Sequence, residues 1–280
     1  MAEAARKAFI IGHPISHSRS PMIHGHWLEK YDLAGSYERI DVAPSDLTAF
    51  VRGMRDNGFV GGNVTIPHKE AVCGLVDHVD EAAQLIGAAN TLWFEDGRLN
   101  GSNSDAPGFA ADLDNRAAGW RQARAALVLG AGGASRAVLF ALIQAGIPEI
   151  RLVNRSPKRA RELADRFGSG VRAELWDARN ELASGAQLVV NTTSIGLNGE
   201  GGSPLDVANL PDDAIVNDIV YTPLLTPLLA AARARGLKTV DGLGMLLEQA
   251  VPGFERWFGV RPQVTEALRA LVVADIEAHR

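Results

Sequence analysis

Apolar and polar positions alternate along the first hundred residues in the way typical of successive strands and helices. Short apolar runs predict strands, and the segments that follow them carry apolar residues at helical spacing. We expect these elements in turn at residues 8–11, 22–31, 37–42, 46–56, 62–66 and 68–76. Ser20-Pro21 suits the start of the first helix, with serine as the N-cap. Asp96-Gly97 predicts a hairpin turn within residues 91–99.

The second half repeats the alternation with more regular spacing. A helix is expected to start near Ala106, and strands are expected at residues 126–129, 149–153, 188–191, 215–218 and 238–241. The last forty residues have a helical pattern, with a packing stripe formed by Val264, Leu268, Leu271, Val272 and Ile276. Strands that alternate with helices predict an α/β fold with parallel sheets covered by helices on both faces.

A glycine-rich turn follows the first strand of this second series. The apolar run at residues 127–129 leads into Gly130-Ala131-Gly132, and a helical pattern comes next. In this context Gly130 permits a tight turn, and Gly132 lets the backbone approach a pyrophosphate at the helix N-terminus. Ser135 replaces the usual third glycine, and the alternative is a plain strand–helix–strand unit. We interpret the turn as a dinucleotide site.

The end of the next strand indicates which dinucleotide is bound. A site for NAD usually has an acidic residue about 20 residues after the glycine turn, where it binds the ribose 2′-hydroxyl. Here the chain offers Asn154 and Arg155, followed by Lys158 and Arg159. Neutral and basic groups suit a 2′-phosphate, so NADP is favoured. The alternative is that this basic segment is only a solvated helix face.

Composition narrows the function classes. A chain of 280 residues with 46% hydrophobic and 22% charged residues fits one large globular domain or two ordinary ones. The net charge of −5, with no basic face, argues against nucleic acid as a partner. Cys73 is the only cysteine, no leader is evident, and no run approaches the ~18 apolar residues of a membrane helix. We therefore expect a cytoplasmic protein without a membrane partner.

Three polar segments of the first half are candidates for chemistry. Residues 12–21, GHPISHSRSP, offer hydroxyls before a helix start, which suits a small anion such as a carboxylate. Lys69 follows a strand in NVTIPHK, where a lysine can transfer protons, although a lone lysine is more often a surface charge. Asp105 lies in NSDAPG and from local sequence is more simply an N-cap. The seven histidines show no metal-ligand spacing, so we expect no catalytic metal.

Taken together, these segments give the chain a family resemblance. Ordered blocks from about Phe9 to about Leu271 resemble the shikimate dehydrogenase family: GHPISHSRSP, NVTIPHK, GAANTL, NSDAPG, GAGGASRA, VNRS, NTTSIGL, DIVYTPLLTPLL and DGLGMLLEQA. The resemblance implies a substrate-binding catalytic domain at residues 1–105 and an NADP-binding Rossmann-like domain at residues 106–241. Helices at residues 242–280 would return to the first domain, and the active site would lie in a cleft between the domains.

The resemblance also implies residue roles and an activity. Lys69 and Asp105 would be the catalytic pair. The substrate would be bound by Ser16, Ser18, Thr65, Asn90, Tyr221 and Gln249. The cofactor would be bound by Gly130, Ala131, Gly132, Gly133, Ala134, Asn154, Arg155, Ser156, Lys158, Arg159, Ile219 and Gly242. The implied reaction is the NADP-dependent interconversion of 3-dehydroshikimate and shikimate in aromatic amino acid (chorismate) biosynthesis. Assembly as a homodimer is compatible with the sequence.

Departures from the family pattern keep two rival functions open. Ser104 stands where threonine is usual, Gly25 replaces an asparagine, and Ile219 replaces a methionine. These changes leave room for a quinate/shikimate dehydrogenase that uses NAD or NADP. The basic segment after Asn154 argues against the use of NAD. A non-catalytic NADP-binding regulator is the other rival, and the retention of Lys69 and Asp105 argues against it.

Overall fold

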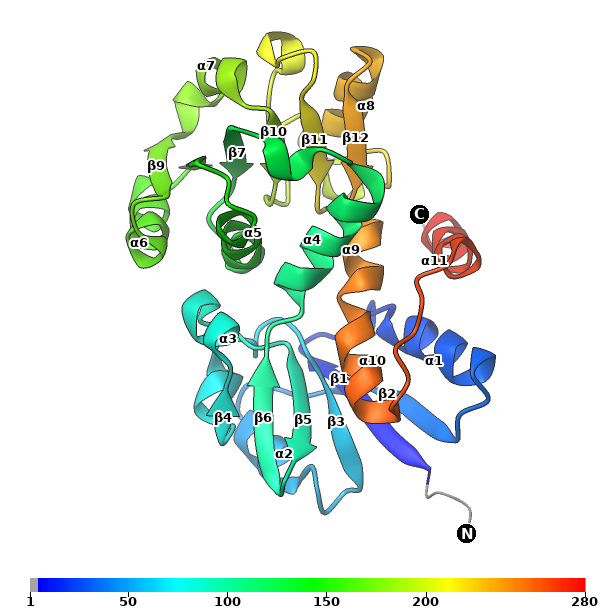
Figure 1. The fold of residues 1–280 in the computed structure, drawn as a ribbon. Helices are drawn as coiled ribbons and strands as arrows, with labels where there is room; N and C mark the ends of the chain where they lie inside the picture. The colour runs from blue at the N-terminus through cyan, green and yellow to red at the C-terminus, as the bar shows by residue number, and fades with distance from the viewer. Residues whose placement is uncertain (1–4, 280) are drawn as a thin grey trace. The chain divides into compact units, whose positions relative to one another are not determined.

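The computed structural model describes residues 5–279, which form two compact units (Figure 1). One unit runs to Ser104 and also includes Gln249–Ala274. The other contains Asp105–Glu248 and the segment from Asp275 onward. Each unit is built on its own six-stranded sheet, so the predicted α/β class with two parts is confirmed. The predicted functional boundaries after residues 105 and 241 stay predictions.

The sheet of the first unit is mixed. Its strands are β1 (Arg6–Gly12), β2 (Gly35–Asp41), β3 (Phe59–Val64), β4 (His78–Val79), β5 (Thr91–Glu95) and β6 (Arg98–Ser102), in the order β2-β1-β3-β5-β6-β4. β1 is parallel to β2 and β3, but β5 is antiparallel to both β3 and β6. Parallel pairing, which the alternation of strands and helices predicts, therefore holds in this sheet for β1 with β2 and β3 and for β4 with β6. The predicted hairpin accounts for the reversal, because Asp96 and Gly97 turn the chain with φ values of +49° and +78°.

The helices of this unit are α1 (Ser20–Lys30), α2 (Leu47–Gly53), α3 (Glu81–Ile86) and α10 (Ala250–Phe258). The helix expected at residues 68–76 is only a 3₁₀ turn at Ala71–Gly74. The Lys69 carbonyl accepts from Ala89 N–H (2.8 Å), and Cys73 N–H bonds three residues back to Glu70, so an α-helical ladder does not form. Ser20 is the first helical residue and Arg19 is the N-cap, so the expected serine cap was also wrong.

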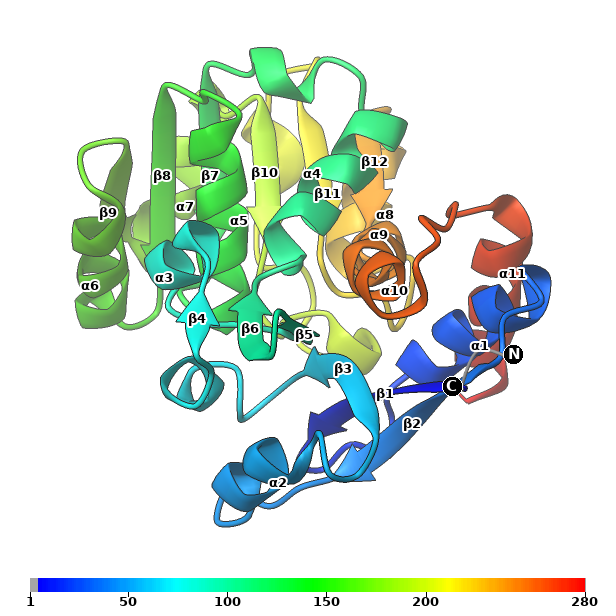
Figure 2. The same cartoon turned by 60° about the horizontal axis from the view of Figure 1, so that its bottom comes forward.

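The second unit has an all-parallel sheet in the order β12-β11-β10-β7-β8-β9 (Figure 2). Its strands are β7 (Ala125–Leu129), β8 (Glu149–Asn154), β9 (Val171–Leu175), β10 (Leu188–Asn191), β11 (Ile215–Asp218) and β12 (Lys238–Asp241). The expected strands are all present. β9 is an edge strand that was not predicted, because only Val171 in it is buried and its apolar signal is weak.

Helices complete the second unit. They are α4 (Asp105–Arg116), α5 (Gly133–Gln144), α6 (Pro157–Phe167), α7 (Arg179–Leu182), α8 (Pro227–Ala234) and α9 (Leu243–Glu248). Short 3₁₀ turns lie at Trp120–Gln122, Trp176–Ala178, Ala183–Gly185, Leu197–Gly199 and Val207–Asn209. α4 and α9 pack side by side, as Figure 1 shows. Glycine at position 244 permits this close contact, because a side chain there would collide with the Asp112 carboxylate.

Separate cores stabilise the two sheets. The first is built around Phe9, Ile11 and Val64 of the parallel strands. The second joins sheet residues such as Leu127 to Leu228 of α8. The last helix, α11 (Glu266–Ala278), buries three members of the expected packing stripe, namely Leu268, Val272 and Ile276. Leu271 is a member of the expected stripe but is 42% exposed.

Candidate active site

The glycine turn has the geometry expected of a phosphate-binding site. Gly130 follows β7 with φ +106°, and a side chain there would lie 2.8 Å from the Thr192 hydroxyl. At Gly132 and Gly133, in contrast, an added Cβ would meet nothing within 4 Å. Gly132 is the N-cap of α5 and makes no side-chain capping bond. The space beside the first turn of a twelve-residue helix is therefore open to an anion.

Ser135 keeps this turn in shape although it replaces a glycine. Its side chain is buried, and its hydroxyl donates to the Gly132 carbonyl at 2.6 Å. On the neighbouring strand, Asn154 Oδ1 accepts from Ala131 N–H at 3.2 Å, while its Nδ2 donates to the Ser156 carbonyl at 3.1 Å. Asn154 thus ties the glycine turn to the end of β8, which brings these two predicted cofactor segments together.

The start of α6 carries the predicted basic groups. Ser156 is the N-cap, and its hydroxyl accepts from Arg159 N–H at 3.5 Å. Arg155, Lys158 and Arg159 are all exposed. Lys158 lies 3.8 Å from Glu162, one helical turn later, and this exposed pair contributes little to stability. The ends of β7 and β8 therefore present amide and guanidinium donors, and the position after β8 holds no acidic residue.

The ends of β10 and β11 are joined by buried hydrogen bonds next to the predicted cofactor residue Ile219. Asp218 is buried and accepts from Asn191 Nδ2 (3.0 Å), Val220 N–H (3.1 Å) and the Thr226 hydroxyl (2.7 Å). Burial raises the pKa of Asp218 to about 6, and these hydrogen bonds oppose the shift. They also fix the segment after β11, which carries Ile219 and, two residues later, Tyr221. Asn191 and Asp218 were not among the predicted site residues.

Gly242 reaches this segment through backbone packing. A Cβ at Gly242 would lie 2.1 Å from the Ile219 carbonyl oxygen, so only glycine fits there without a shift. The predicted residues Ile219 and Gly242 are therefore neighbours.

The loop with the predicted carboxylate-binding serines follows β1. Ser16 is exposed and Ser18 is half-buried. Two residues of β2 hold the loop in place. Asp41 accepts from His13 Nδ1 (2.6 Å) and from Ile15 N–H (3.3 Å), and Arg39 donates to the Ser18 carbonyl (2.5 Å). The His13 side chain lowers the pKa of Asp41.

The turn after β3 places Thr65 and Lys69, which are both half-buried. His68 lies between them and is buried, with its Nε2 2.7 Å from the Val42 carbonyl. The Thr65 carbonyl accepts from His68 N–H (2.9 Å), which closes the turn. The bond between Ala89 N–H and the Lys69 carbonyl joins this turn to the segment that carries Asn90. The position of Lys69 is thus fixed by backbone hydrogen bonds within its turn and from Ala89.

Asn90 is the centre of the polar interior of the first unit. Its Oδ1 accepts from Ser104 N–H (2.7 Å), the Ser104 hydroxyl (3.1 Å) and the Thr91 hydroxyl (3.0 Å). All three residues are buried. Serine at position 104 therefore supplies the hydroxyl contact that threonine would offer. Ser104 directly precedes Asp105, the first residue of α4, so Asn90 also anchors the chain next to the predicted catalytic carboxylate.

The predicted residues fall into two groups. Within the first unit lie Ser16, Ser18, Thr65, Lys69, Asn90 and Gln249. Within the second lie Asp105, Tyr221 and the predicted cofactor residues. Gln249 is 9% exposed and precedes α10 as its N-cap. Gly25, the other departure, has nothing within 4 Å of an added Cβ, so an asparagine side chain would have room there.

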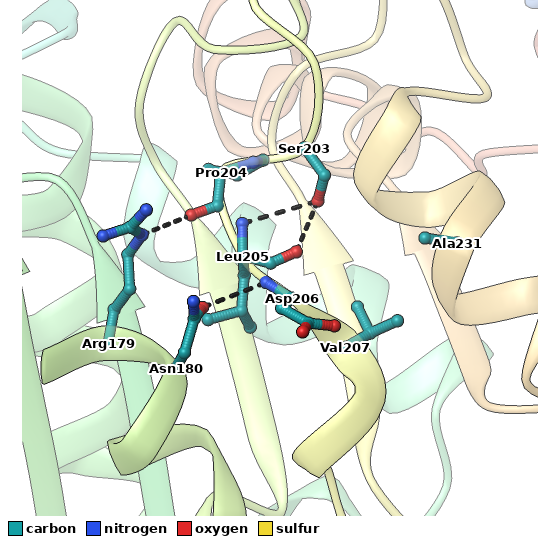
Figure 3. Close-up of a pocket in the computed structure, with 8 residues that line it drawn as sticks. All are labelled: Arg179, Asn180, Ser203, Pro204, Leu205, Asp206, Val207 and Ala231. Carbon is teal, nitrogen blue, oxygen red and sulfur yellow. Dashed lines mark hydrogen bonds between the residues drawn. The ribbon is translucent and has the colours of Figure 1, made fainter. Parts of the chain in front are cut away.

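A separate hollow of about 430 Å³ lies on the second unit (Figure 3). It is lined by Arg179, Asn180, Ser203, Pro204, Leu205, Asp206, Val207 and Ala231. Arg179 Nε donates to the Pro204 carbonyl (2.8 Å), and Asp206 N–H donates to Asn180 Oδ1 (3.0 Å). These bonds join α7 to the segment at residues 203–207. None of the predicted site residues lines this hollow, and we assign no ligand to it.

Family models match most of the chain in three consecutive parts. Residues 10–92 match the shikimate dehydrogenase substrate binding domain. Residues 113–196 match shikimate / quinate 5-dehydrogenase, and residues 242–272 match the shikimate 5′-dehydrogenase C-terminal domain. A shikimate dehydrogenase (NADP(+)) of Mesorhizobium japonicum is 63% identical over 276 residues, which cover 99% of each chain. The chain belongs to the shikimate dehydrogenase family. The resemblance inferred from the motifs is thus confirmed.

Solved structures of the family share the fold. Shikimate 5-dehydrogenase from Thermus thermophilus, in complex with NADP(H) and shikimate, is 40% identical with a TM-score of 0.86. That match covers 97% of this chain and 99% of the other. Quinate dehydrogenase from Corynebacterium glutamicum, in complex with NAD, is 31% identical with a TM-score of 0.89 and covers 96% and 99% of the two chains. Among residues 5–279, no helix has the length and apolar character needed to cross a membrane.

Proposed function

We propose that this chain is an NADP-dependent shikimate dehydrogenase, which interconverts 3-dehydroshikimate and shikimate in the cytoplasm as a step of aromatic amino acid biosynthesis. The observation that carries the cofactor choice is the end of β8, where Asn154 takes the place of an acidic residue and bonds back to the glycine turn. Family membership and the 63% identity to a relative named for NADP support the same activity. A homodimer is the assembly that we propose to test by solution mass.

The cofactor residues fit NADP on chemical grounds. The open space at Gly132 and Gly133 leaves the first amides of α5 accessible to a pyrophosphate, with Ala131 and Ala134 in the same turn. Arg155 would bind the 2′-phosphate through its planar guanidinium, and Ser156, Lys158 and Arg159 would add hydroxyl and charge contacts. Ile219, positioned by Gly242, would contact the nicotinamide. When bound, NADP supplies the hydride acceptor or donor at the nicotinamide ring.

The substrate side would be built largely from the first unit. Ser16 and Ser18 would bind the carboxylate, and Thr65, Asn90 and Gln249 the ring hydroxyls. Tyr221 would contact the substrate from the second unit. Asn90 Oδ1 already accepts three hydrogen bonds, so its Nδ2 is the end of the amide suited to donate to a substrate hydroxyl.

The reaction needs one proton to move with each hydride. When the alcohol is oxidised, its hydroxyl proton leaves as the carbon–hydrogen bond breaks, and Lys69 would accept that proton. In the reductive direction Lys69 would return the proton to the new alkoxide oxygen. Asp105 would share a hydrogen-bond network with Lys69 and with the same hydroxyl.

The test is NADP or NAD reduction, measured with shikimate and with quinate, on the wild type and on Arg155→Ala. The wild type should turn over shikimate with NADP most efficiently. Arg155→Ala should lose charge-assisted bonds worth about 1.5–3 kcal/mol and so weaken NADP binding roughly 10- to 150-fold, with little change for NAD. Arg161→Ala, further along α6, is the matched control. Equal losses for both cofactors would contradict the proposed role of Arg155.

The same measurements separate the rival functions. Comparable turnover of quinate would indicate a quinate/shikimate dehydrogenase. NADP binding with no turnover of either substrate would favour a non-catalytic regulator.

A further inference from the structure

A line of buried polar contacts runs beneath the proposed substrate side of the first unit. It begins at Tyr37 on β2, passes through Asn63 on β3 and Thr91 on β5, and ends at Asn90 and Ser104. Asn63 is 4% exposed, and Thr91, Asn90 and Ser104 are also buried. None of the proposed ligand roles uses Tyr37 or Asn63, so this arrangement requires an explanation of its own.

From Tyr37 to Asn90 the hydrogen bonds of this line run in one direction. The Tyr37 hydroxyl donates to Asn63 Oδ1 at 2.6 Å. This bond fixes the amide of Asn63 so that its Nδ2 donates to the Asn90 carbonyl (3.0 Å) and to the Thr91 hydroxyl oxygen (3.3 Å). The Thr91 hydroxyl in turn donates to Asn90 Oδ1 (3.0 Å). Each donor thus orients the next acceptor, and such chains polarise one another.

The end of the line is where the reaction is proposed to occur. Asn90 Oδ1 collects the donors, and among them Ser104 gives both its N–H and its hydroxyl. Asp105 follows Ser104 directly in the chain. Any rotation of the Asn90 amide would therefore turn its donor end away from a substrate hydroxyl and release the backbone next to Asp105.

We propose that Tyr37 is a positioning residue of the reaction, which acts through Asn63 to orient Asn90 and to hold Ser104 beside Asp105. The proposal rests on the proposed function, because the roles of Asn90 and Asp105 come from it. Tyr37 is itself held by packing, since its ring stacks on His24 with centroids 4.0 Å apart. A phenylalanine at position 37 would keep this stack and remove only the hydroxyl.

The decisive variant is Tyr37→Phe. Loss of the hydroxyl leaves Asn63 Oδ1 without its donor in a buried place, which favours rotation of that amide. The kcat/KM for shikimate should fall about 5- to 30-fold, while the KM for NADP should change less than about twofold. Tyr31→Phe is the matched control in the same unit. The Tyr31 oxygen accepts from Gln263 N–H at 3.2 Å, and this bond is not part of the line from Tyr37 to Ser104. Loss of the Tyr31 hydroxyl should therefore leave both kinetic constants unchanged.

A double-mutant cycle tests the path itself. Ser104→Ala removes the last hydroxyl of the line, so its effect on kcat/KM should overlap with that of Tyr37→Phe, and the double variant should lose clearly less than the product of the two single losses. Thermal melting of each variant shows whether a loss reflects unfolding.

Three results would overturn the proposal. The first is a Tyr37→Phe variant with a lower melting temperature but unchanged kinetic constants. The second is a rise in the KM for NADP as large as the fall in kcat/KM for shikimate. The third is strict multiplicativity in the cycle. Wild-type inactivity with shikimate would instead overturn the proposed function, and with it the positioning role of Tyr37. If the wild type is active and Tyr37→Phe has the same kinetic constants, the positioning role of Tyr37 is overturned but the proposed function is not.

Discussion

His24 makes the first unit sensitive to acid. It is fully buried on α1, where its ring stacks on Tyr37 and lies 5.5 to 5.9 Å from the rings of Trp27, Phe254 and Trp257. Among the described residues, neither ring nitrogen has a hydrogen-bond partner. Burial lowers the pKa of His24 from 6.5 to about 3, and the neighbouring Asn63 side chain offsets this only in part. The folded protein therefore keeps this imidazole neutral while the unfolded chain can protonate it.

The sign and size of the effect follow from linkage. Because the folded pKa lies below the unfolded value, the unfolded state binds more protons between about pH 6.5 and 3, and stability falls as the pH falls through this range. The full shift corresponds to about 5 kcal/mol, of which about 2 kcal/mol is lost by pH 5. We expect His24→Phe, which keeps an aromatic ring in the stack, to remove this component.

The assay is urea unfolding at pH 7.5 and at pH 5, followed by tryptophan fluorescence, to which Trp27 and Trp257 beside His24 contribute. The wild type should lose about 2 kcal/mol more than His24→Phe on acidification. The larger ring can cost stability by overpacking, but that cost is the same at both pH values and cancels in the comparison. His78→Phe, at an exposed site in the same unit, is the control and should behave like the wild type. Equal acid losses in the wild type and His24→Phe would refute the reasoning.

Further predictions address the reaction and the second unit. Lys69→Ala should keep NADP binding, measured by fluorescence titration, but lower kcat by roughly 10²- to 10⁴-fold, and Asp105→Asn should also lower kcat. Asp105 is the first residue of α4 and not its N-cap as the local sequence suggested, so a change in melting temperature alone would mean that its carboxylate only stabilises the start of the helix. Ser16→Ala and Ser18→Ala should each raise the KM for shikimate about 10- to 150-fold, through loss of about 1.5–3 kcal/mol, with the KM for NADP unchanged. For Asp218, whose pKa is raised to about 6, the contribution to stability has the opposite sign to that of His24 and should fall as the pH rises from 4 to 7. Chemical unfolding of Asp218→Asn should lack this slope, which is worth up to about 3 kcal/mol, and an unchanged slope would rule out Asp218 as its source.

Sequence patterns predicted the second sheet better than the first. Strand β7 is buried at every residue and is wholly apolar, so it appears as a continuous apolar run in the sequence, and β10 and β11 each begin with buried apolar residues. In the first unit the antiparallel strand β5 joins the sheet through a hairpin, and only the Asp96-Gly97 turn signalled the reversal. The turn that carries Lys69 looked helical because the backbone bond from Ala89, which interrupts it, comes from a distant segment.

The candidate site shows a similar limit. The glycine turn and the neutral residue at position 154 were readable, because strand–turn–helix order and charge are local properties of the sequence. The supporting contacts were not readable. Asn191 bonds to Asp218 across 27 residues, and Tyr37 bonds to Asn63 across 26. Pairings of this kind depend on strand order, which the pattern of single strands does not determine.

Gly242 shows how a motif can place a residue in a site for a reason that the motif does not reveal. Family resemblance assigns it to the cofactor, and its lack of a side chain suggests room for a ligand. The structure shows a different reason for glycine at this position, because a Cβ there would lie 2.1 Å from the Ile219 carbonyl oxygen. The same glycine precedes α9, and Asp241 before it accepts from Arg116 Nη2 at 2.6 Å. Under the proposed function, Gly242 would support the cofactor site indirectly, by fixing the position of Ile219. Tyr37 would support the substrate site in the same indirect way, through Asn63.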